Sequence, residues 1–338
     1  MNARRSRLLL GLTAATCVIA VGLGAVLLSA SKGSLTFVRN SLLSAPSTQH
    51  GFDWTPGDAP SDFMLETLPP PPAIASAAAA ALVRRPPTTN NGLDAAIAIA
   101  RHLGTNTRQG GAIRRNTLTT LERIREKGRG YCADYSQVFM ALALAADIPV
   151  REWGFGEDGF GAGHAFNEIY DTDYGKWIFI DPFQAFYVVD AQSGTPLSVV
   201  EFLQRLRQGV DAANVTVVRT ADEQFRFRSP RDALAYYAKA TDYFYLFWGN
   251  NVFTYDANPW VAAAAQVSRV LEIVTAILVG VQPHIVPVPT ETNPSAIRGL
   301  ALARVLVLAL LCAIGALGLL VALQLRARAQ NRHVAALY

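Results

Sequence analysis

The sequence predicts an α+β domain that lies outside the cytoplasm, between two transmembrane helices. Hydrophobic residues make up 51% of the 338 residues and charged residues only 17%, which is too apolar for a typical soluble protein. Two uncharged segments account for the excess, and the section between them is ordinary and polar. In that section, patterns with a helical period come first, and alternating patterns typical of strands follow. Helices followed by antiparallel strands indicate the α+β class.

The two uncharged segments are Leu8–Ala30 and Val305–Leu325. Each is long enough to cross roughly 30 Å of hydrocarbon as a helix. The alternative for the first segment is a cleaved signal peptide, but its apolar core exceeds the usual ~7–15 residues. Cleavage after Ala30 would also place Leu28 at the −3 position, where a small residue is usual. We therefore expect an uncleaved anchor, and the section between the segments is exported in either case.

Arginines at the two ends of the chain indicate its orientation. Positive residues stay on the cytoplasmic side of a membrane, so clusters outside both segments place both termini in the cytoplasm. Arg298 and Arg304, on the exported flank, argue mildly against this orientation. The net charge of +4 comes largely from the tails, and we expect no nucleic-acid partner. The clusters are Arg4, Arg5 and Arg7 before the first segment, and Arg326, Arg328 and Arg332 after the second.

Composition divides the chain into six predicted parts. Turn residues and the prolines of LPPPP indicate an extended connector between the first segment and the domain. The parts are residues 1–30, a cytoplasmic tail and transmembrane helix; 31–90, an exported connector with an alanine-rich helix; 91–190, the core domain; 191–304, an exported helical extension rich in aromatic residues; 305–325, a transmembrane helix; and 326–338, a cytoplasmic tail.

Several helices and three strands are expected up to residue 190. Asn90 or Asn91 is the expected cap of the second helix, and Gly128 ends the third in the usual role of a glycine after a helix. The TDYG turn joins the last two strands into a hairpin. The helices are Ala73–Val83, Asn91–Leu103, Thr117–Lys127 and the pattern from Asp134 to Asp147, and the strands are Val150–Phe155, His164–Asp171 and Lys176–Asp181.

Cys132 is the one cysteine of three in polar sequence, since Cys17 and Cys312 lie inside the apolar segments. Structural cysteines in an oxidising compartment come in pairs, and Cys132 has no partner outside the membrane. A small buried hydrophobic residue is the simplest alternative. Cys132 begins a helical pattern, however, and the free N–H groups and dipole of a helix N-terminus favour an anion, as a thiolate nucleophile requires.

His164 and Asp181 stand at facing ends of the predicted hairpin. His164 begins one strand and Asp181 ends the other, and in an antiparallel pair these two ends are neighbours. A thiol, an imidazole and a carboxylate together suit nucleophilic catalysis: Cys132 attacks, His164 removes and returns its proton, and Asp181 fixes the tautomer of the ring. We therefore predict a catalytic triad of Cys132, His164 and Asp181.

Three motifs around these residues resemble the core of the transglutaminase-like superfamily. They are GRGYCADYSQVFMALALAADIPVR, GHAFNEIY and WIFIDP, in the order and context of that family. The resemblance covers about residues 92–190 and implies a papain-like α+β fold, in which the Cys132 helix packs on an antiparallel sheet. It also implies the same three catalytic residues. Asp147 replaces a glycine that is commoner in the turn and Phe166 stands where tryptophan is usual, and both positions shape packing more than chemistry.

Members of this superfamily include protein-crosslinking enzymes, cysteine proteases, deamidases and peptide-N-glycanases. We therefore expect a bacterial inner-membrane protein whose main domain is periplasmic and acts on amide or peptide bonds of a protein or peptide substrate. The sequence does not choose between hydrolysis and transamidation. The alternative is a docking or assembly module of a secretion or polysaccharide system in the cell envelope, with envelope partners and a dispensable triad.

Other motifs point to structure rather than to further chemistry. GFGEDG, residues 154–159, matches a dinucleotide-binding pattern but leads into a strand, so we interpret it as a lip beside His164. His102 and His284 have no cysteine or histidine partner at metal-ligand spacing, and we expect no metal and no cofactor. Acidic residues with an expected structural role are Glu168 in a salt bridge or at the surface, Asp134 at a helix N-terminus, and Asp171 and Asp173 in a turn.

The extension from residue 191 contains two ambiguous stretches. Asp232–Trp260 is unusually aromatic, so it is either a core helix that packs beneath the catalytic domain or a stretch that lies against lipid, and both readings stay open. Val261–Val281 is mostly apolar, but Arg269 and Glu272 interrupt it and, three residues apart on a helix, are placed to pair. We expect a surface or juxtamembrane helix there, because a third span would put the C-terminus outside.

Overall fold

The structure is a computed structural model in which the chain forms two compact units, described here one at a time. One unit contains residues 1–44 and 294–338, and the other contains residues 45–293. The expected helix caps Asn90 and Asn91 lie outside the described residues. The described residues are 3–32, 34–45, 51–83, 92–104, 111–113 and 115–335.

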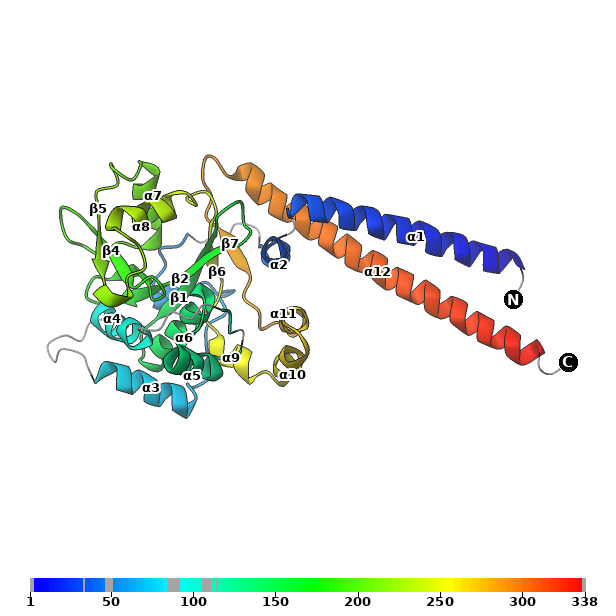
Figure 1. The fold of residues 1–338 in the computed structure, drawn as a ribbon, viewed down its shortest axis with the longest axis horizontal. Helices are drawn as coiled ribbons and strands as arrows, with labels where there is room; N and C mark the ends of the chain where they lie inside the picture. Colours follow the sequence, from blue (N-terminus) through cyan, green and yellow to red (C-terminus); the bar gives the residue numbers. More distant parts are fainter. Residues whose placement is uncertain are drawn as a thin grey trace. The chain divides into compact units, whose positions relative to one another are not determined.

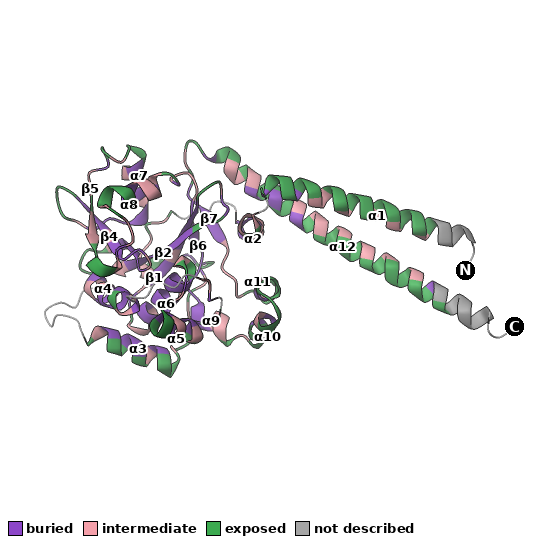
Figure 2. Cartoon of the chain, in the orientation of Figure 1, coloured by how far each residue is buried: buried purple, intermediate pink, exposed green. Residues whose placement is uncertain are grey.

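The first unit consists of helices. They are α1 (Ala3–Ala30), α2 (Leu35–Leu43) and α12 (Pro294–Ala335). In the part of the chain that the structure describes, two stretches are long and apolar enough to cross a membrane: Leu8–Ala30, with a mean hydropathy of 2.2, and Pro294–Ala327, with 2.9. Most of their length is exposed in this unit (Figure 2). Both predicted segments are therefore confirmed as long apolar helices, and α12 begins before the predicted span.

Helices α1 and α12 run antiparallel within their unit. Leu27, near the end of α1, packs against Ala303 and Val307, near the start of α12. Toward the other end, the Nε2 atom of Gln324 donates a hydrogen bond to Oγ1 of Thr13 at 2.7 Å. Such polar contacts hold apolar helices in one register. The start of α1 and the end of α12 therefore lie at the same end of the pair (Figure 1).

The second unit is built on one antiparallel sheet. Its strands are β1 (Val150–Gly156), β2 (Gly163–Asp171), β3 (Lys176–Asp181), β4 (Phe186–Asp190), β5 (Val215–Arg219), β6 (Phe244–Phe247) and β7 (Ile285–Pro287). Within the described residues the order is β5-β4-β3-β2-β1-β6-β7, and neighbouring strands are antiparallel. The predicted hairpin of β2 and β3 is present, with Asn167 opposite Ile180. Three strands come from beyond residue 190, so the predicted 91–190 core holds part of the sheet.

Helices cover both faces of this sheet. They are α3 (Pro72–Leu82), α4 (Gly92–Leu103), α5 (Thr117–Lys127), α6 (Cys132–Ala145), α7 (Val199–Arg207), α8 (Pro230–Ala238), α9 (Val252–Ala257), α10 (Pro259–Val267) and α11 (Arg269–Leu278), with short 3-10 turns at Pro56–Asp58 and Asp222–Gln224. Helices α3, α4 and α6 pack on one face, against Ile169 and Ile178, while α7 and α8 cover the other, with Phe166 and Phe179 (Figure 1). Successive strand residues point to opposite faces, which separates these two sets.

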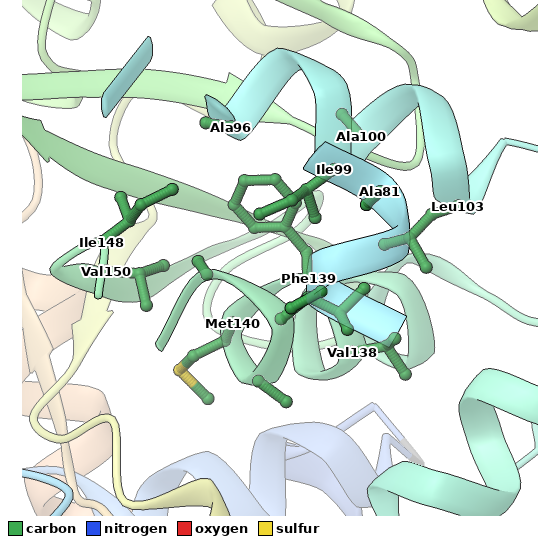
Figure 3. Close-up of a cluster of buried hydrophobic side chains, with 14 of the residues drawn as sticks. Ala81, Ala96, Ile99, Ala100, Leu103, Val138, Phe139, Met140, Ile148 and Val150 are labelled. Atoms are coloured by element: carbon green, nitrogen blue, oxygen red, sulfur yellow. The ribbon is translucent and has the colours of Figure 1, made fainter. Parts of the chain in front are cut away.

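The core on the α6 face holds the cysteine-bearing helix in place (Figure 3). Phe139 of α6, Ile99 of α4 and Val150 of β1 are completely buried in one cluster. Small residues such as Ala96 allow α4 to approach α6 closely. Buried apolar surface contributes about 25 cal/mol per Å², so this cluster fixes α6, and with it Cys132, against the sheet.

Local signals in the sequence set the ends of the helices. The side chain of Asn116 caps α5 by accepting a hydrogen bond from the Thr119 N–H at 2.9 Å, and Gly128 follows the helix with a φ of 57°, as predicted. Asp147, after the end of α6, has a φ of 56°. Glycine adopts this left-handed conformation without steric cost, which accounts for the preference for glycine in that turn.

Most of the aromatic stretch Asp232–Trp260 belongs to the core of the domain. Phe244 and Trp248 are completely buried. Strand β6 lies within the stretch and pairs with β1, where Leu246 stands opposite Trp153. Of the two readings that the sequence left open, the structure agrees with the position in the core, but the stretch holds a strand between two helices and not the single core helix of that reading. The stretch also extends the sheet, and the compact unit continues to Asn293.

Val261–Val281 forms short helices rather than the single helix that we predicted. Ser268 separates α10 from α11 because its backbone is extended, and its side chain caps α11 by accepting a hydrogen bond from the Leu271 N–H at 3.1 Å. Each helix is too short to span a membrane. The predicted ion pair between Arg269 and Glu272 is present. Much of the remaining surface of α11 is apolar and exposed.

Candidate active site

Cys132 is the first residue of α6, and its side chain is half-buried. The carboxylate of Asp134 fixes the helix start, because Oδ2 accepts hydrogen bonds from the N–H groups of Tyr131 at 2.8 Å and Ile113 at 3.1 Å. Asp134 is thus the N-terminal helix charge that the sequence predicted. The Sγ atom of Cys132 lies 4.0 Å from the carbonyl oxygen of Gly163, where β2 begins.

Two glycines allow the backbone to pass close to the thiol. A Cβ atom at Gly163 would lie 1.9 Å from the carbonyl oxygen of Phe155 in β1, so a larger residue requires the strands to move apart. Gly130, two residues before Cys132, has a φ of 127°, a conformation that side chains rarely adopt. The glycines in the motifs therefore serve to bring the start of α6 to the start of β2.

His164 and Asp181 form a buried ion pair, as the sequence predicted. The Nε2 atom of His164 lies 2.5 Å from Oδ2 of Asp181, and the two residues are 4% and 0% exposed. The register of β2 and β3 places Asn167 opposite Ile180. Asp181 is therefore opposite Phe166, one step along the same face of the sheet from His164. The two side chains meet diagonally across the hairpin.

The carboxylate of Asp181 is hydrogen-bonded on both oxygens. Oδ1 accepts hydrogen bonds from the N–H groups of Phe183 at 2.9 Å and Gln184 at 2.8 Å. Oδ2 accepts one from the hydroxyl of Tyr237, in addition to its contact with His164. A buried charge is strongly unfavourable unless such partners compensate it. These bonds fix the orientation of the carboxylate and, through it, that of the imidazole ring.

The surroundings of His164 favour its protonated form. Burial lowers the pKa of a histidine, but the charge and hydrogen bond of Asp181 outweigh this effect, and Cys132 adds to the increase. Together they raise the pKa of His164 to about 10. Because Nε2 faces Asp181, Nδ1 is the ring nitrogen that remains for the thiol of Cys132.

Glu168, on the same face of β2, has a structural role. Its Oε2 atom accepts hydrogen bonds from Nε of Arg151 and Nε1 of Trp153, both at 2.7 Å, and Oε1 accepts one from the Val199 N–H at 2.7 Å. Glu168 is completely buried. It is therefore salt-bridged, as expected, but in the core and not at the surface.

Asp171 connects the turn after β2 to helix α4. Oδ1 accepts hydrogen bonds from the N–H groups of Asp173 at 2.9 Å and Tyr174 at 3.0 Å, which is the predicted turn role. Oδ2 accepts one from the Leu93 N–H at 2.7 Å. The start of α4 is thus fixed by the hairpin that carries His164.

Sequence reasoning missed two tyrosines that α8 adds to the site. Tyr237 is completely buried, and its hydroxyl donates to Asp181. The ring of Tyr236 lies 5.8 Å from that of His164, edge to face. The sequence does signal the helix, because Ser229 is its N-cap. Nothing in the sequence indicates that Tyr237 meets a carboxylate 56 positions earlier.

The Gly154–Gly159 segment lies beside His164, where the lip was expected. It includes the end of β1 and the turn into β2, and Oε1 of Glu157 accepts a hydrogen bond from the hydroxyl of Tyr236 at 3.4 Å. Among the residues that the structure describes, no group of three or more His, Cys, Asp or Glu is placed to hold a metal ion.

A comparison with known families agrees with this geometry. A model of the transglutaminase-like superfamily matches residues 76–182. The match begins in α3 and ends just after Asp181, so it contains Cys132 and His164 as well. No curated protein and no solved structure matches the chain. Residues 76–182 therefore form a transglutaminase-like superfamily domain, and the predicted superfamily and the α+β fold are confirmed.

We expect His164 to stay protonated through neutral pH and to lose its proton near pH 10. Asp181→Asn removes the charge that outweighs burial, so the pKa of His164 should fall to its ordinary value of ~6.5 or below. Cys132→Ala should lower it by less. The measurement is a ¹³C NMR titration of the histidine rings in the full chain in detergent, with His164→Ala to identify the signal. A signal that titrates near pH 6.5 in both the wild type and Asp181→Asn would contradict the ion pair.

Proposed function

We propose that this chain is a membrane-anchored cysteine enzyme that transfers acyl groups from amide or peptide bonds. The observation that supports the proposal is the position of the Cys132 thiol, 4.0 Å from the carbonyl oxygen of Gly163, beside the next residue, His164, whose imidazole lies 2.5 Å from the buried carboxylate of Asp181. Cys132 is half-buried and Asp181 is completely buried, so a protein or peptide substrate reaches the thiol, and with it the Nδ1 side of His164, but not the carboxylate.

The reaction uses the proton that His164 already carries. The thiolate of Cys132 attacks the carbonyl carbon, and the N–H groups at the start of α6 stabilise the oxyanion. His164 gives its proton to the leaving amine, the C–N bond breaks, and a thioester remains. Water or a second amine then attacks the thioester while neutral His164 takes its proton. The thiolate leaves, and the ion pair is restored. Water completes a hydrolysis, and an amine completes a transamidation.

The alternative, a docking or assembly module of the cell envelope, explains the site less well. A buried ion pair contributes little to stability compared with apolar residues of similar size. A scaffold therefore gains little from keeping His164 and Asp181 charged in its core. A half-buried thiol beside that pair adds nothing to packing, whereas a catalyst needs all three groups.

The two apolar helices supply the anchor in this proposal. We place them in a bacterial inner membrane, with both termini in the cytoplasm and residues 45–293 in the periplasm. The antiparallel packing of α1 and α12 supports this arrangement, because it brings both termini to the same end of the pair. The arginine clusters at both ends of the chain support the orientation.

The α10–α11 pair supports an additional contact with the lipid surface. Trp260 and Leu278 are 70% and 80% exposed. The charged residues of the pair are Arg269 and Glu272, which bind each other. Exposed apolar surface of this kind marks an interaction site, and tryptophan favours the membrane interface.

Asp181→Asn should lower the rate of acyl transfer by about 10⁴, because loss of the orienting carboxylate in a related triad has that effect. This corresponds to ~5.5 kcal/mol at 1.36 kcal/mol per tenfold. Cys132→Ala and His164→Ala should abolish the reaction. The measurement is the release of p-nitrophenol from p-nitrophenyl acetate by the full chain in detergent, with mass spectrometry to locate the acetyl group on Cys132.

Asp190→Asn provides a matched control. Asp190 ends β4 as Asp181 ends β3, and its Oδ1 atom accepts hydrogen bonds from the N–H groups of Gln192 at 3.0 Å and Ser193 at 2.8 Å. The same substitution at this position should leave the rate unchanged. Equal rates for the wild type and all the active-site variants would refute the enzyme and favour the docking module.

Reporter fusions test the proposed topology. A reporter after Tyr338 should be active as a cytoplasmic fusion, and one inserted within residues 51–72 should be active as an exported fusion, because arginines retain both tails inside. An exported C-terminus would contradict the arrangement with two spans.

Trp260 should be quenched by lipids with brominated acyl chains when the full chain is reconstituted in liposomes, because its exposed ring would lie at the interface. The difference between the wild type and Trp260→Phe isolates its fluorescence. Trp248→Phe is the control, since Trp248 is completely buried and should respond little to brominated lipid. Equal quenching at the two positions would rule out the lipid contact of α10–α11.

A further inference from the structure

Helix α8 brings a second hydrogen-bond donor to the oxygen that holds the histidine. The hydroxyl of Tyr237 donates to Oδ2 of Asp181, the same atom that lies 2.5 Å from Nε2 of His164. Tyr237 and Asp181 are both completely buried. The carboxylate therefore divides its charge between a phenol and an imidazolium, away from water.

Packing alone does not account for a hydroxyl at this position. The neighbours of Tyr237 are almost all phenylalanines, and phenylalanine would fill the same space without burying a polar group. Burial and the charge of Asp181 raise the pKa of Tyr237 well above its ordinary value, so the hydroxyl stays a donor at every pH at which the domain works. The rings with centroids 5.3–5.7 Å from that of Tyr237 include Phe155, Phe166, Phe179, Phe186 and Phe202.

From this geometry we infer that Tyr237 is a positioning residue of the active site, which acts through Asp181 to limit how strongly the carboxylate stabilises the imidazolium form of His164. The purpose of this role rests on the proposed function, since the imidazolium must release its Nδ1 proton to the leaving amine. Tyr237 lies 55 positions beyond the end of the family match (237 − 182), in helix α8, outside the matched residues.

The direction of the effect follows from the sharing of one oxygen. A hydrogen bond from a neutral phenol disperses the negative charge on Oδ2 and weakens its attraction for the imidazolium. Without the hydroxyl, more negative charge remains on Oδ2 of Asp181, and its attraction for the imidazolium of His164 is stronger. His164 then keeps its proton to higher pH and becomes a weaker acid toward the leaving group.

Other groups around the pair stay the same when the hydroxyl is removed. Among the described residues, the other titratable groups that act on His164, Tyr236 or Tyr237 include Cys132 of α6 and Glu157 of the β1–β2 turn. The guanidinium of Arg226 stacks on the Phe183 ring at 3.8 Å, and that ring lies 6.0 Å from the His164 ring. A change in the titration of His164 can therefore be assigned to Tyr237.

The test measures the titration of His164 by ¹³C NMR in the full chain in detergent. Tyr237→Phe should raise the pH at which His164 loses its proton by about one unit, the size expected for part of a hydrogen bond to a charged group. Site-specific 3-fluorotyrosine at position 237 is a stronger donor and should shift the titration in the opposite direction. The second variant keeps the hydrogen bond and the packing, so it remains informative if Tyr237→Phe disturbs the fold.

Tyr255→Phe is the matched control. The hydroxyl of Tyr255 also donates to a buried carboxylate, Oε1 of Glu272 at 3.0 Å, outside the active site. Its loss should lower stability and leave His164 unchanged. An unchanged titration in both Tyr237 variants, or an equal shift in Tyr255→Phe, would overturn the inference. The titration needs no substrate. If the wild type fails to transfer an acyl group, the proposed function is refuted, but the effect of Tyr237 on His164 is still measured.

Discussion

The buried ion pair between His164 and Asp181 is the contact on which the geometry of the candidate site depends. Both residues lie on the face of the sheet opposite α6, whereas Cys132 belongs to α6 itself. The thiol approaches the imidazole at the start of β2, where Gly163 lets the strand pass close to Cys132. The sheet must therefore be held on both faces at once. The α3, α4 and α6 core fixes the thiol, and α7 and α8 enclose the pair.

The sequence predicted the parts of this arrangement that depend on local pattern. Alternation along β2 and β3 put His164 and Asp181 on one face, and the turn between the strands fixed their register. It did not predict Tyr237, because that contact joins residues 56 positions apart and no local pattern encodes such a meeting. For the same reason the sequence did not decide between the two readings of Asp232–Trp260, because the pairing of β6 with β1 joins residues that are far apart in the chain. Ser268 was read as part of a helix although its side chain suits a cap.

Two buried ion pairs, Arg151–Glu168 and His164–Asp181, lie on the same face of the sheet. The first is structural and the second is a candidate for catalysis. Glu168 binds Arg151, Trp153 and the backbone of Val199, and so ties β1 and β2 to α7. Asp181 ties β3 to β2 and α8 in a similar way. The difference lies in the cation, because an arginine keeps its proton in proteins whereas a histidine exchanges one. Similar hydrogen bonding of the carboxylate thus makes the first pair rigid and leaves the second pair with a proton that can be transferred.

The burial of His164 and Asp181 also limits which side of the site is accessible to a substrate. Asp181 is held by two backbone N–H groups and by side chains from β2 and α8, so its position is fixed by the fold and not by a ligand. Cys132 is half-buried, and Tyr131 beside it is 51% exposed. Under the proposed function, the substrate is therefore selected on the α6 side, at the thiol, and the imidazole that transfers the proton is almost completely buried. Under the proposed topology, that open side meets the periplasm, and a domain attached to helices at both ends reaches only substrates near the membrane.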